Sequence, residues 1–297
     1  MTAPPSTTPP AQRTEAEIDA LRETYGLDYQ VPHLLDAEQI VGIRGKRVLE
    51  AGGSLPAGLV MDELGAKQWI GIIEPDWRPN RSDISGSDGA EHPGLDESRR
   101  LGDVAGAEEL EAHQILAGAV ENIPESLAGH FDLIFSTAAF EHFLKFPAAL
   151  ERMYRALRPG GCLFAMIGPI WSAHDGHHLP PITDKSGVRM NFHSSPIPPW
   201  GHLLMRPPEM YRHLLTATDA ETAQAMVYAI YHAPGINRLF TEDYVAHFKD
   251  SSFEVEELTT VWNIEVKQNV QKALEAAHPG RKHFANNGLR AVLRRPE

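Results

Sequence analysis

Short apolar runs alternate with helix-like segments between Arg47 and Ile167, and this alternation constrains the fold more than any other feature of the sequence. The runs have the length of strands, whereas Phe146–Leu157 repeats its apolar residues every three or four positions, as a helix does. Strands that alternate with helices predict a parallel sheet with right-handed crossovers. The five expected strands are residues 47–50, 68–73, 114–117, 131–135 and 162–167.

The alternation ends at Gly168, where a stretch rich in proline and histidine begins. Beyond it, residues 219–233 and Thr241–Phe248 read as helices, and Phe253–Trp262 and Leu289–Leu293 read as strands. We therefore expect an α/β fold with a seven-stranded, mostly parallel sheet and helices on both faces. The last strand should be antiparallel, and a lid insertion should separate the fifth and sixth strands.

Local signals divide the chain further. Thr14 is the expected N-cap of a first helix, Ala57–Leu64 and Val104–Ala112 read as helices, and Trp77–Gly102 reads as a loop. The expected parts are a disordered tail (1–13), an N-terminal helical cap (14–45), a ligand-binding core (46–168), a lid or substrate insertion (169–250) and C-terminal strands (251–297).

Composition narrows the classes of function. The net charge of −13 argues against nucleic acid as a partner, because binding to phosphates needs a positive surface. Cys162 is the only cysteine, so an internal disulfide and a CxxC zinc site are excluded, and a reducing cytoplasm is the expected location. The sequence shows neither a signal peptide nor an apolar run of membrane-spanning length, so no membrane association is expected.

Four segments that follow or end the predicted strands carry polar or glycine-rich sequence. They are Glu50–Ser54, Glu74, Gly118–Pro124 and Phe131–Ser136, the last followed by Phe140–His142. Glycines let a ligand approach the backbone, and an acid after the second strand can accept hydrogen bonds from ribose hydroxyls. Asp76 is a second candidate for that acid. Because the carboxyl ends of parallel strands meet at one edge, these segments predict a single ligand site there.

The order of these segments resembles the class I, Rossmann-like S-adenosylmethionine-dependent methyltransferases, and in particular the subgroup that modifies small molecules. The resemblance spans about residues 46–168 and includes the Leu157–Gly161 turn before the fifth strand. It implies S-adenosyl-L-methionine as cofactor and S-adenosyl-L-homocysteine as product. The cofactor-binding residues that it implies are Glu50, Ala51, Gly52, Gly53, Glu74, Ala119, Val120 and Ser136.

Three positions depart from the pattern of that family. Glu50 replaces the usual aspartate, Ser54 stands in place of the second glycine, and Ala119 replaces the acid that contacts the adenine amino group. A backbone group at Val120, or the side chain of Glu121, would then have to supply the adenine contact.

Histidines gather just after the fifth strand, in the segment Pro169–His178 that should overhang the site. His174, His142 and His178 are the candidate catalytic residues, because a neutral imidazole can accept a proton from a hydroxyl or an amine. A metal site and a purely structural loop remain open as alternatives. Neighbouring histidines such as His177 and His178 usually point apart, so no metal is predicted. The candidate substrate contacts are Trp171, Asp175 and Phe140.

The resemblance and the histidines together suggest transfer of a methyl group to an oxygen or nitrogen of a small molecule or short peptide. Two other classes stay open: a cyclase, isomerase or decarboxylase on the same fold, and a non-catalytic binding subunit. A nicotinamide dehydrogenase fits less well, because the glycine turn lacks the GxGxxG pattern. The sequence also leaves a homodimer open.

Overall fold

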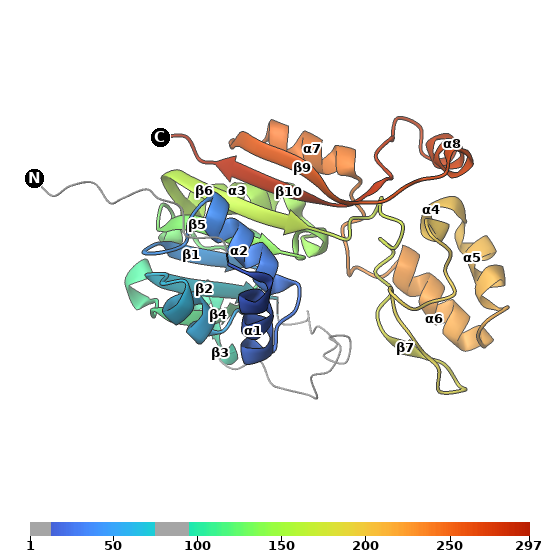
Figure 1. The fold of residues 1–297 in the computed structure, drawn as a ribbon, viewed down its shortest axis with the longest axis horizontal. Helices are drawn as coiled ribbons and strands as arrows, with labels where there is room; N and C mark the ends of the chain where they lie inside the picture. The colour runs from blue at the N-terminus through green and yellow to red at the C-terminus, as the bar shows by residue number, and fades with distance from the viewer. Residues whose placement is uncertain (1–12, 75–94) are drawn as a thin grey trace, which may run out of the picture.

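The computed structural model describes residues 13–74 and 95–297, and within them an eight-stranded sheet forms the core (Figure 1). The strand order is β3-β4-β2-β1-β5-β6-β10-β9, and β10 runs antiparallel to both of its neighbours. The strands are β1 (Arg47–Ala51), β2 (Gln68–Ile73), β3 (Leu95–Arg100), β4 (His113–Ala117), β5 (Phe131–Thr137), β6 (Leu157–Ile167), β9 (Glu254–Asn263) and β10 (Asn286–Arg294). The predicted parallel sheet with an antiparallel last strand is confirmed.

The expected number of seven strands is wrong by one in the described part of the chain. The additional strand, β3, pairs in parallel with β4 at the sheet edge and lies within Trp77–Gly102, the stretch predicted as a loop. Polar and charged residues dominate its sequence, Leu95-Asp-Glu-Ser-Arg-Arg100, so it has no apolar run that could mark a strand. The predicted tail up to residue 12 and residues 75–94 lie outside the described residues.

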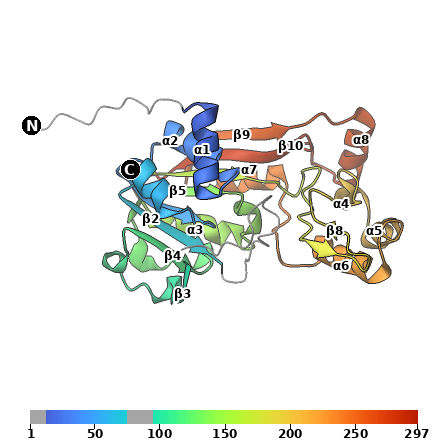
Figure 2. The ribbon, with the colours of Figure 1, turned by 60° about the horizontal axis from the view of Figure 1, so that its bottom comes forward.

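Helices cover both faces of the sheet (Figure 2). On one face pack α1 (Glu15–Tyr25), α2 (Gln30–Ile40) and the single π-helical turn η1 (Gly58–Glu63). On the other face pack α3 (Phe146–Ala156) and α7 (Thr241–Asp250). The buried side of α3 is formed by residues spaced three or four apart, namely Phe146, Ala149, Leu150, Met153 and Ala156, which is the periodicity seen in the sequence.

The helix ends follow local capping chemistry. Thr14 caps α1 as predicted: its side chain accepts a hydrogen bond from Glu17 N, and Glu17 in turn accepts one from Thr14 N. The predicted helix over Val104–Ala112 is wrong, because this segment contains only a short 3-10 turn at Ala107–Glu109. Gly106, in an extended conformation, precedes this turn, and the segment lacks a continuous apolar face.

A second lobe lies beside the sheet (Figure 1). We define this lid lobe as residues 169–236 together with residues 264–285, because both segments supply its apolar core. Its elements are β7 (Ile182–Thr183), β8 (Arg189–Met190), α4 (Gly201–Leu204), α5 (Pro207–Leu214), α6 (Ala220–Tyr231) and α8 (Gln268–Ala277). The buried Leu274 and Phe284, which come from the connection between β9 and β10, pack with Met210 and Met226 from the first segment.

The two lobes are joined by hydrogen bonds next to the carboxyl ends of β5 and β6. Ile170 N donates to Asn287 O (2.9 Å), and His142 Nδ1 donates to Gly235 O (2.7 Å). The helix α7 lies within the range expected for the lid insertion, yet its buried Tyr244 and Phe248 belong to the hydrophobic cluster of the sheet.

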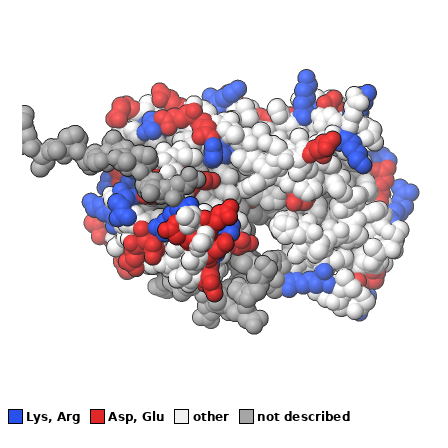
Figure 3. All heavy atoms as spheres, viewed as in Figure 1, with Lys and Arg blue, Asp and Glu red and all other residues white. Residues whose placement is uncertain are grey.

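Charged side chains of both signs intermingle over the sheet lobe and around the outer rim of the lid lobe (Figure 3). The same view shows the surface hollowed between the two lobes, beside predominantly uncharged residues. None of the helices in residues 13–74 and 95–297 is long and apolar enough to cross a membrane.

Candidate active site

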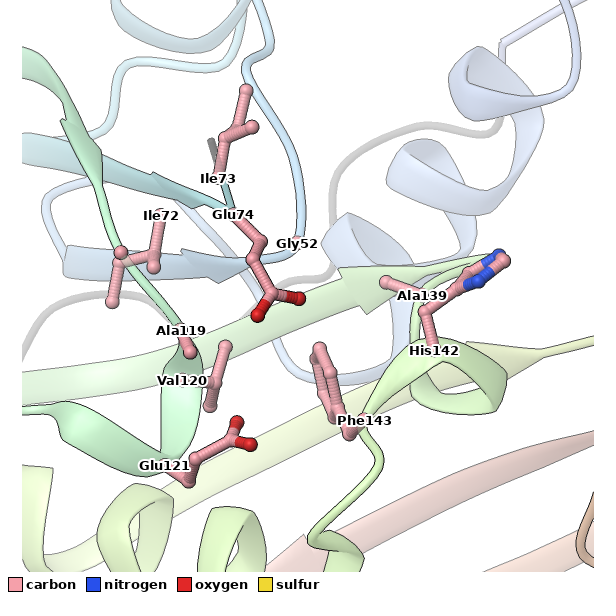
Figure 4. A pocket seen from close by; sticks show the side chains of 11 residues that line it. Gly52, Ile72, Ile73, Glu74, Ala119, Val120, Glu121, Ala139, His142 and Phe143 are labelled. Carbon is pink, nitrogen blue, oxygen red and sulfur yellow. The ribbon is translucent and has the colours of Figure 1, made fainter. Parts of the chain in front are cut away.

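A small, open pocket lies at the carboxyl edge of the sheet (Figure 4). Two strand-end hydrogen bonds bring its loops together: Gly52 N donates to Ile72 O (3.0 Å), and Gly118 N donates to Ile73 O (2.8 Å). The lining residues are Gly52, Ile72, Ile73, Glu74, Gly118, Ala119, Val120, Glu121, Ala139, His142 and Phe143. The loops after β1, β2, β4 and β5 therefore converge on one site.

The glycine turn after β1 tolerates no side chain. Gly52 has a φ of +84°, and a Cβ there would lie 2.4 Å from the Cβ of Ala139. A Cβ at Gly71, in the neighbouring β2, would lie 2.6 Å from the backbone oxygen of Gly53. The turn consequently passes close to both β2 and the loop after β5. Glycine at positions 52 and 71 permits this close packing.

Glu50 supports this turn from below rather than lining the pocket. Its carboxylate is 3% exposed and accepts hydrogen bonds from Leu55 N (2.9 Å) and from Trp69 Nε1 (2.7 Å). Burial raises the pKa of Glu50 to about 7, although the two hydrogen bonds favour the charged form. Because Trp69 lies on β2 and Leu55 lies beyond the turn, Glu50 links the turn to the sheet.

Two carboxylates face the pocket instead. Glu74 follows β2, and Figure 4 shows its carboxylate pointing into the space between Val120 and Phe143. Glu121 points into the same space from the turn after β4, whereas Ala119 contributes only its methyl group. Acids beside apolar side chains suit a ligand that combines hydroxyl groups with a flat ring. Asp76, the other candidate, lies outside the described residues.

Two other residues implied for the cofactor, Ala51 and Ser136, do not line the pocket. Both are almost fully buried, and Ser136 Oγ donates to Ala51 O (2.7 Å). This bond connects β1 to β5. Gly52, Glu74, Ala119 and Val120 line the pocket.

His142 and His178 form a contact pair between the lobes, with ring centroids 5.4 Å apart. His142 Nδ1 donates to Gly235 O (2.7 Å), and His178 Nε2 donates to Pro169 O (2.5 Å). Burial lowers the pKa of both side chains, and that of His178 falls to about 3. Each ring is thus held neutral, with its protonated nitrogen bound to a carbonyl oxygen.

His174 has a different environment. Its side chain is 31% exposed, Nδ1 lies 2.9 Å from Asn287 Oδ1, and the Asp175 carboxylate lies 3.5 Å from the same nitrogen. The ring also packs near Trp200, with centroids 6.0 Å apart. An imidazole oriented by a carboxylate and an amide resembles the pairing of a base with its orienting group in many active sites.

The aromatic candidates for substrate contact are engaged within the protein. Phe140 is fully buried, with Phe146 and Phe248 as ring neighbours. Trp171 is 9% exposed, with the guanidinium of Arg238 over its ring and the ring of His202 in a T-shaped contact with it. Both side chains therefore have the surroundings of core residues.

Sequence reasoning missed several residues of this region. Phe143 and Ala139 line the pocket, Trp69 holds Glu50, and Asn287 holds His174. Asn287 is about a hundred residues from its partner, so no local pattern could have indicated the contact. Within the described ranges, no three His, Cys, Asp or Glu side chains are grouped so that they could hold a metal ion.

Comparisons with known proteins agree with this geometry. Residues 85–165 match a protein family described as a methyltransferase domain. The trans-aconitate 2-methyltransferase of Deinococcus radiodurans is 35% identical over 86 residues, which are 29% of this chain and 31% of that protein. The malonyl-[acyl-carrier protein] O-methyltransferase of Serratia marcescens is 30% identical over 141 residues, which are 44% of this chain and 50% of that protein. The chain thus spans about a third to a half of the length of these curated relatives.

A solved S-adenosylmethionine-dependent methyltransferase from Mesorhizobium loti covers 85% of this chain and 92% of its own, at 15% identity and a TM-score of 0.42. The sheet order defines a Rossmann-like α/β fold, and the glycine turn and the acid after β2 lie together at the carboxyl edge of its sheet. The match to the methyltransferase domain covers residues 85–165, about a quarter of the chain, and agrees with the resemblance to class I S-adenosylmethionine-dependent methyltransferases seen in the sequence.

Proposed function

We propose that the protein transfers a methyl group from S-adenosylmethionine to an oxygen or nitrogen atom of a small organic molecule. The observation that carries the proposal is the pocket in which the Gly52 turn, the Glu74 carboxylate and the Val120–Phe143 wall converge (Figure 4). The family match over residues 85–165 supports the same reaction class, and the two named relatives are methyltransferases.

The residues of the pocket fit this cofactor. Glu74 would accept hydrogen bonds from the ribose hydroxyls, and Val120 and Phe143 would enclose the adenine ring. Glu121 would accept a hydrogen bond from the adenine amino group, in place of the acid that Ala119 lacks. Gly52 would bring the backbone close to the methionine portion, because no side chain intervenes there.

When bound, S-adenosylmethionine supplies an electrophilic methyl group on its sulfonium. The protein positions the acceptor and keeps water away through the lid lobe, and positioning of this kind accounts for much of catalysis. His174 would be the base, because its partly exposed ring could take the proton from an acceptor hydroxyl or amine. His142 and His178 are weaker bases at neutral pH, because burial lowers the pKa of each. They would serve to orient the acceptor.

Calorimetry with S-adenosylhomocysteine tests the donor site. We expect binding to the unaltered protein and a loss of roughly 10- to 100-fold on Glu74→Gln, since a hydrogen bond to a charged group contributes about 1.5–3 kcal/mol. Glu23→Gln, on the exposed side of α1, is the matched control and should bind normally. Absence of binding to the unaltered protein would overturn the proposal.

Turnover is tested with methyl-labelled S-adenosylmethionine and a panel of phenols, carboxylic acids and amines. We expect release of S-adenosylhomocysteine together with a product heavier by one methylene group. His174→Gln should then lower turnover by roughly 10²- to 10⁴-fold while leaving the affinity for S-adenosylhomocysteine unchanged. Product formation without S-adenosylhomocysteine would instead indicate a non-methylating enzyme.

A further inference from the structure

Asn287 is the residue through which the sheet lobe contacts the histidine-rich segment of the lid. It follows Asn286 at the start of β10, and its side-chain oxygen lies 2.9 Å from His174 Nδ1. Its backbone oxygen accepts a hydrogen bond from Ile170 N (2.9 Å), in the segment that leads to His174. A Cβ at Gly168 would lie 2.7 Å from that same backbone oxygen, so the two segments are in close contact.

The oxygen atoms that face His174 Nδ1 favour a proton on this nitrogen. Asn287 Oδ1 and Asp175 Oδ1 both face this nitrogen, at 2.9 Å and 3.5 Å, and both are acceptors. A lone pair on Nδ1 would face two oxygens without any hydrogen between them. Asp175 Oδ1 is buried and has no hydrogen-bond partner within the described residues, so at its longer distance it adds to the preference that the Asn287 contact sets.

We propose that Asn287 is a positioning residue that holds His174 in its Nδ1–H tautomer, so that Nε2 carries the lone pair for the acceptor's proton. This inference rests on the proposed function, in which His174 is the base. Asp175 assists by stabilising the proton on Nδ1 and the positive charge that the ring acquires. Because Asn287 belongs to a strand of the sheet, the base on the lid is fixed relative to the donor site.

Three titratable side chains lie near His174. From its own segment it faces the Asp175 carboxylate and the His177 ring, and from α4 it is coupled to His202. Burial lowers the pKa of His177 and of His202 to about 3, so both are neutral near neutral pH. Asp175 is then the nearby charge, and Asn287 is a neutral partner.

The tautomer is measured by long-range ¹H–¹⁵N NMR of the full chain, with His174→Gln used to assign the ring signals. We expect the Nδ1–H form in the unaltered protein and an increased share of the Nε2–H form in Asn287→Leu. Asn263→Leu, on the neighbouring strand β9, is the matched control and should leave the signals unchanged. The Nε2–H form in the unaltered protein, or no change in Asn287→Leu, would overturn the inference.

Asn287→Asp provides a second test that does not depend on loss of packing. A carboxylate at this position places an opposite charge beside the ring, which favours the imidazolium. With an identified acceptor, the acidic limb of the turnover profile of Asn287→Asp should therefore move to higher pH. An unmoved acidic limb in Asn287→Asp would refute the contact. Failure of S-adenosylhomocysteine to bind would refute the proposed function without affecting the tautomer.

Discussion

The buried pair formed by Glu50 and Trp69 allows a prediction whose size depends on pH. Burial raises the pKa of Glu50 from 4.5 to about 7 in the folded protein. At a pH between these two pKa values, the folded protein therefore holds a proton that the unfolded chain has lost. The stabilisation from this group is present below pH 4.5 and is lost as pH rises through 7. Each pKa unit corresponds to about 1.4 kcal/mol, so this shift lowers the free energy of unfolding by about 3 kcal/mol over that pH range.

Trp69→Phe removes the Nε1–H donor that favours the charged carboxylate. At pH 8, where Glu50 is ionised, the lost hydrogen bond should lower the free energy of unfolding by about 1.5–3 kcal/mol. At pH 5.5 Glu50 is protonated, and the same loss should be about 0.5–1.5 kcal/mol. The smaller ring adds a packing loss that is the same at both pH values. Trp69→Phe should therefore be more destabilising at pH 8.

The assay is urea unfolding followed by circular dichroism at both pH values, which does not depend on the replaced indole. Glu50→Gln is the matched background, because an amide does not titrate in this range. In that background Trp69→Phe should cost the same free energy at pH 5.5 and pH 8. An equal cost at both pH values in the Glu50 protein would show that the carboxylate and the indole are not coupled, and the reasoning would be wrong.

Two further variants test the pocket. Gly52→Ala should destabilise the protein by about 1–3 kcal/mol, as strained non-glycine residues do, and should weaken binding of S-adenosylhomocysteine. Gly102→Ala, where a Cβ meets no atom within 4 Å, should do neither, so equal effects of the two changes would contradict the close packing at Gly52. Glu121→Gln should reduce the preference, seen in calorimetry, for S-adenosylhomocysteine over its inosine analogue, which lacks the adenine amino group. An unchanged preference would exclude Glu121 as the acceptor for that amino group.

The sequence predicted the parallel sheet because its central strands are continuous apolar runs. Leu49, Ile70, Leu133 and Phe164 are all fully buried, and each belongs to such a run. The edge strand β3 could not be predicted in this way, since its residues are mostly charged and it follows residues 75–94. An apolar run in the sequence indicates a central strand, which is buried on both faces of the sheet. It gives no indication of an edge strand made of polar residues.

Residues of the candidate site could be predicted only where they directly follow a predicted strand. The turn at Gly52 and the acid at Glu74 follow strands, so strand prediction also located them. The roles of Glu50 and Asp132 depended on contacts that are remote in sequence. Asp132 accepts hydrogen bonds from Arg47 N (2.8 Å) and Arg158 Nε (2.6 Å) and so ties the starts of three strands together.

The lid lobe draws its core from two separated stretches of chain, and this limits how the lobe can be exchanged between related proteins. A transplant of residues 169–236 alone would leave behind Leu274 and Phe284, and with them part of the interior that the transplanted helices need. A working exchange should therefore require that the β9–β10 connection moves together with the insertion. Chimeras that exchange only the first stretch should carry an unfolded lid lobe beside an intact sheet lobe.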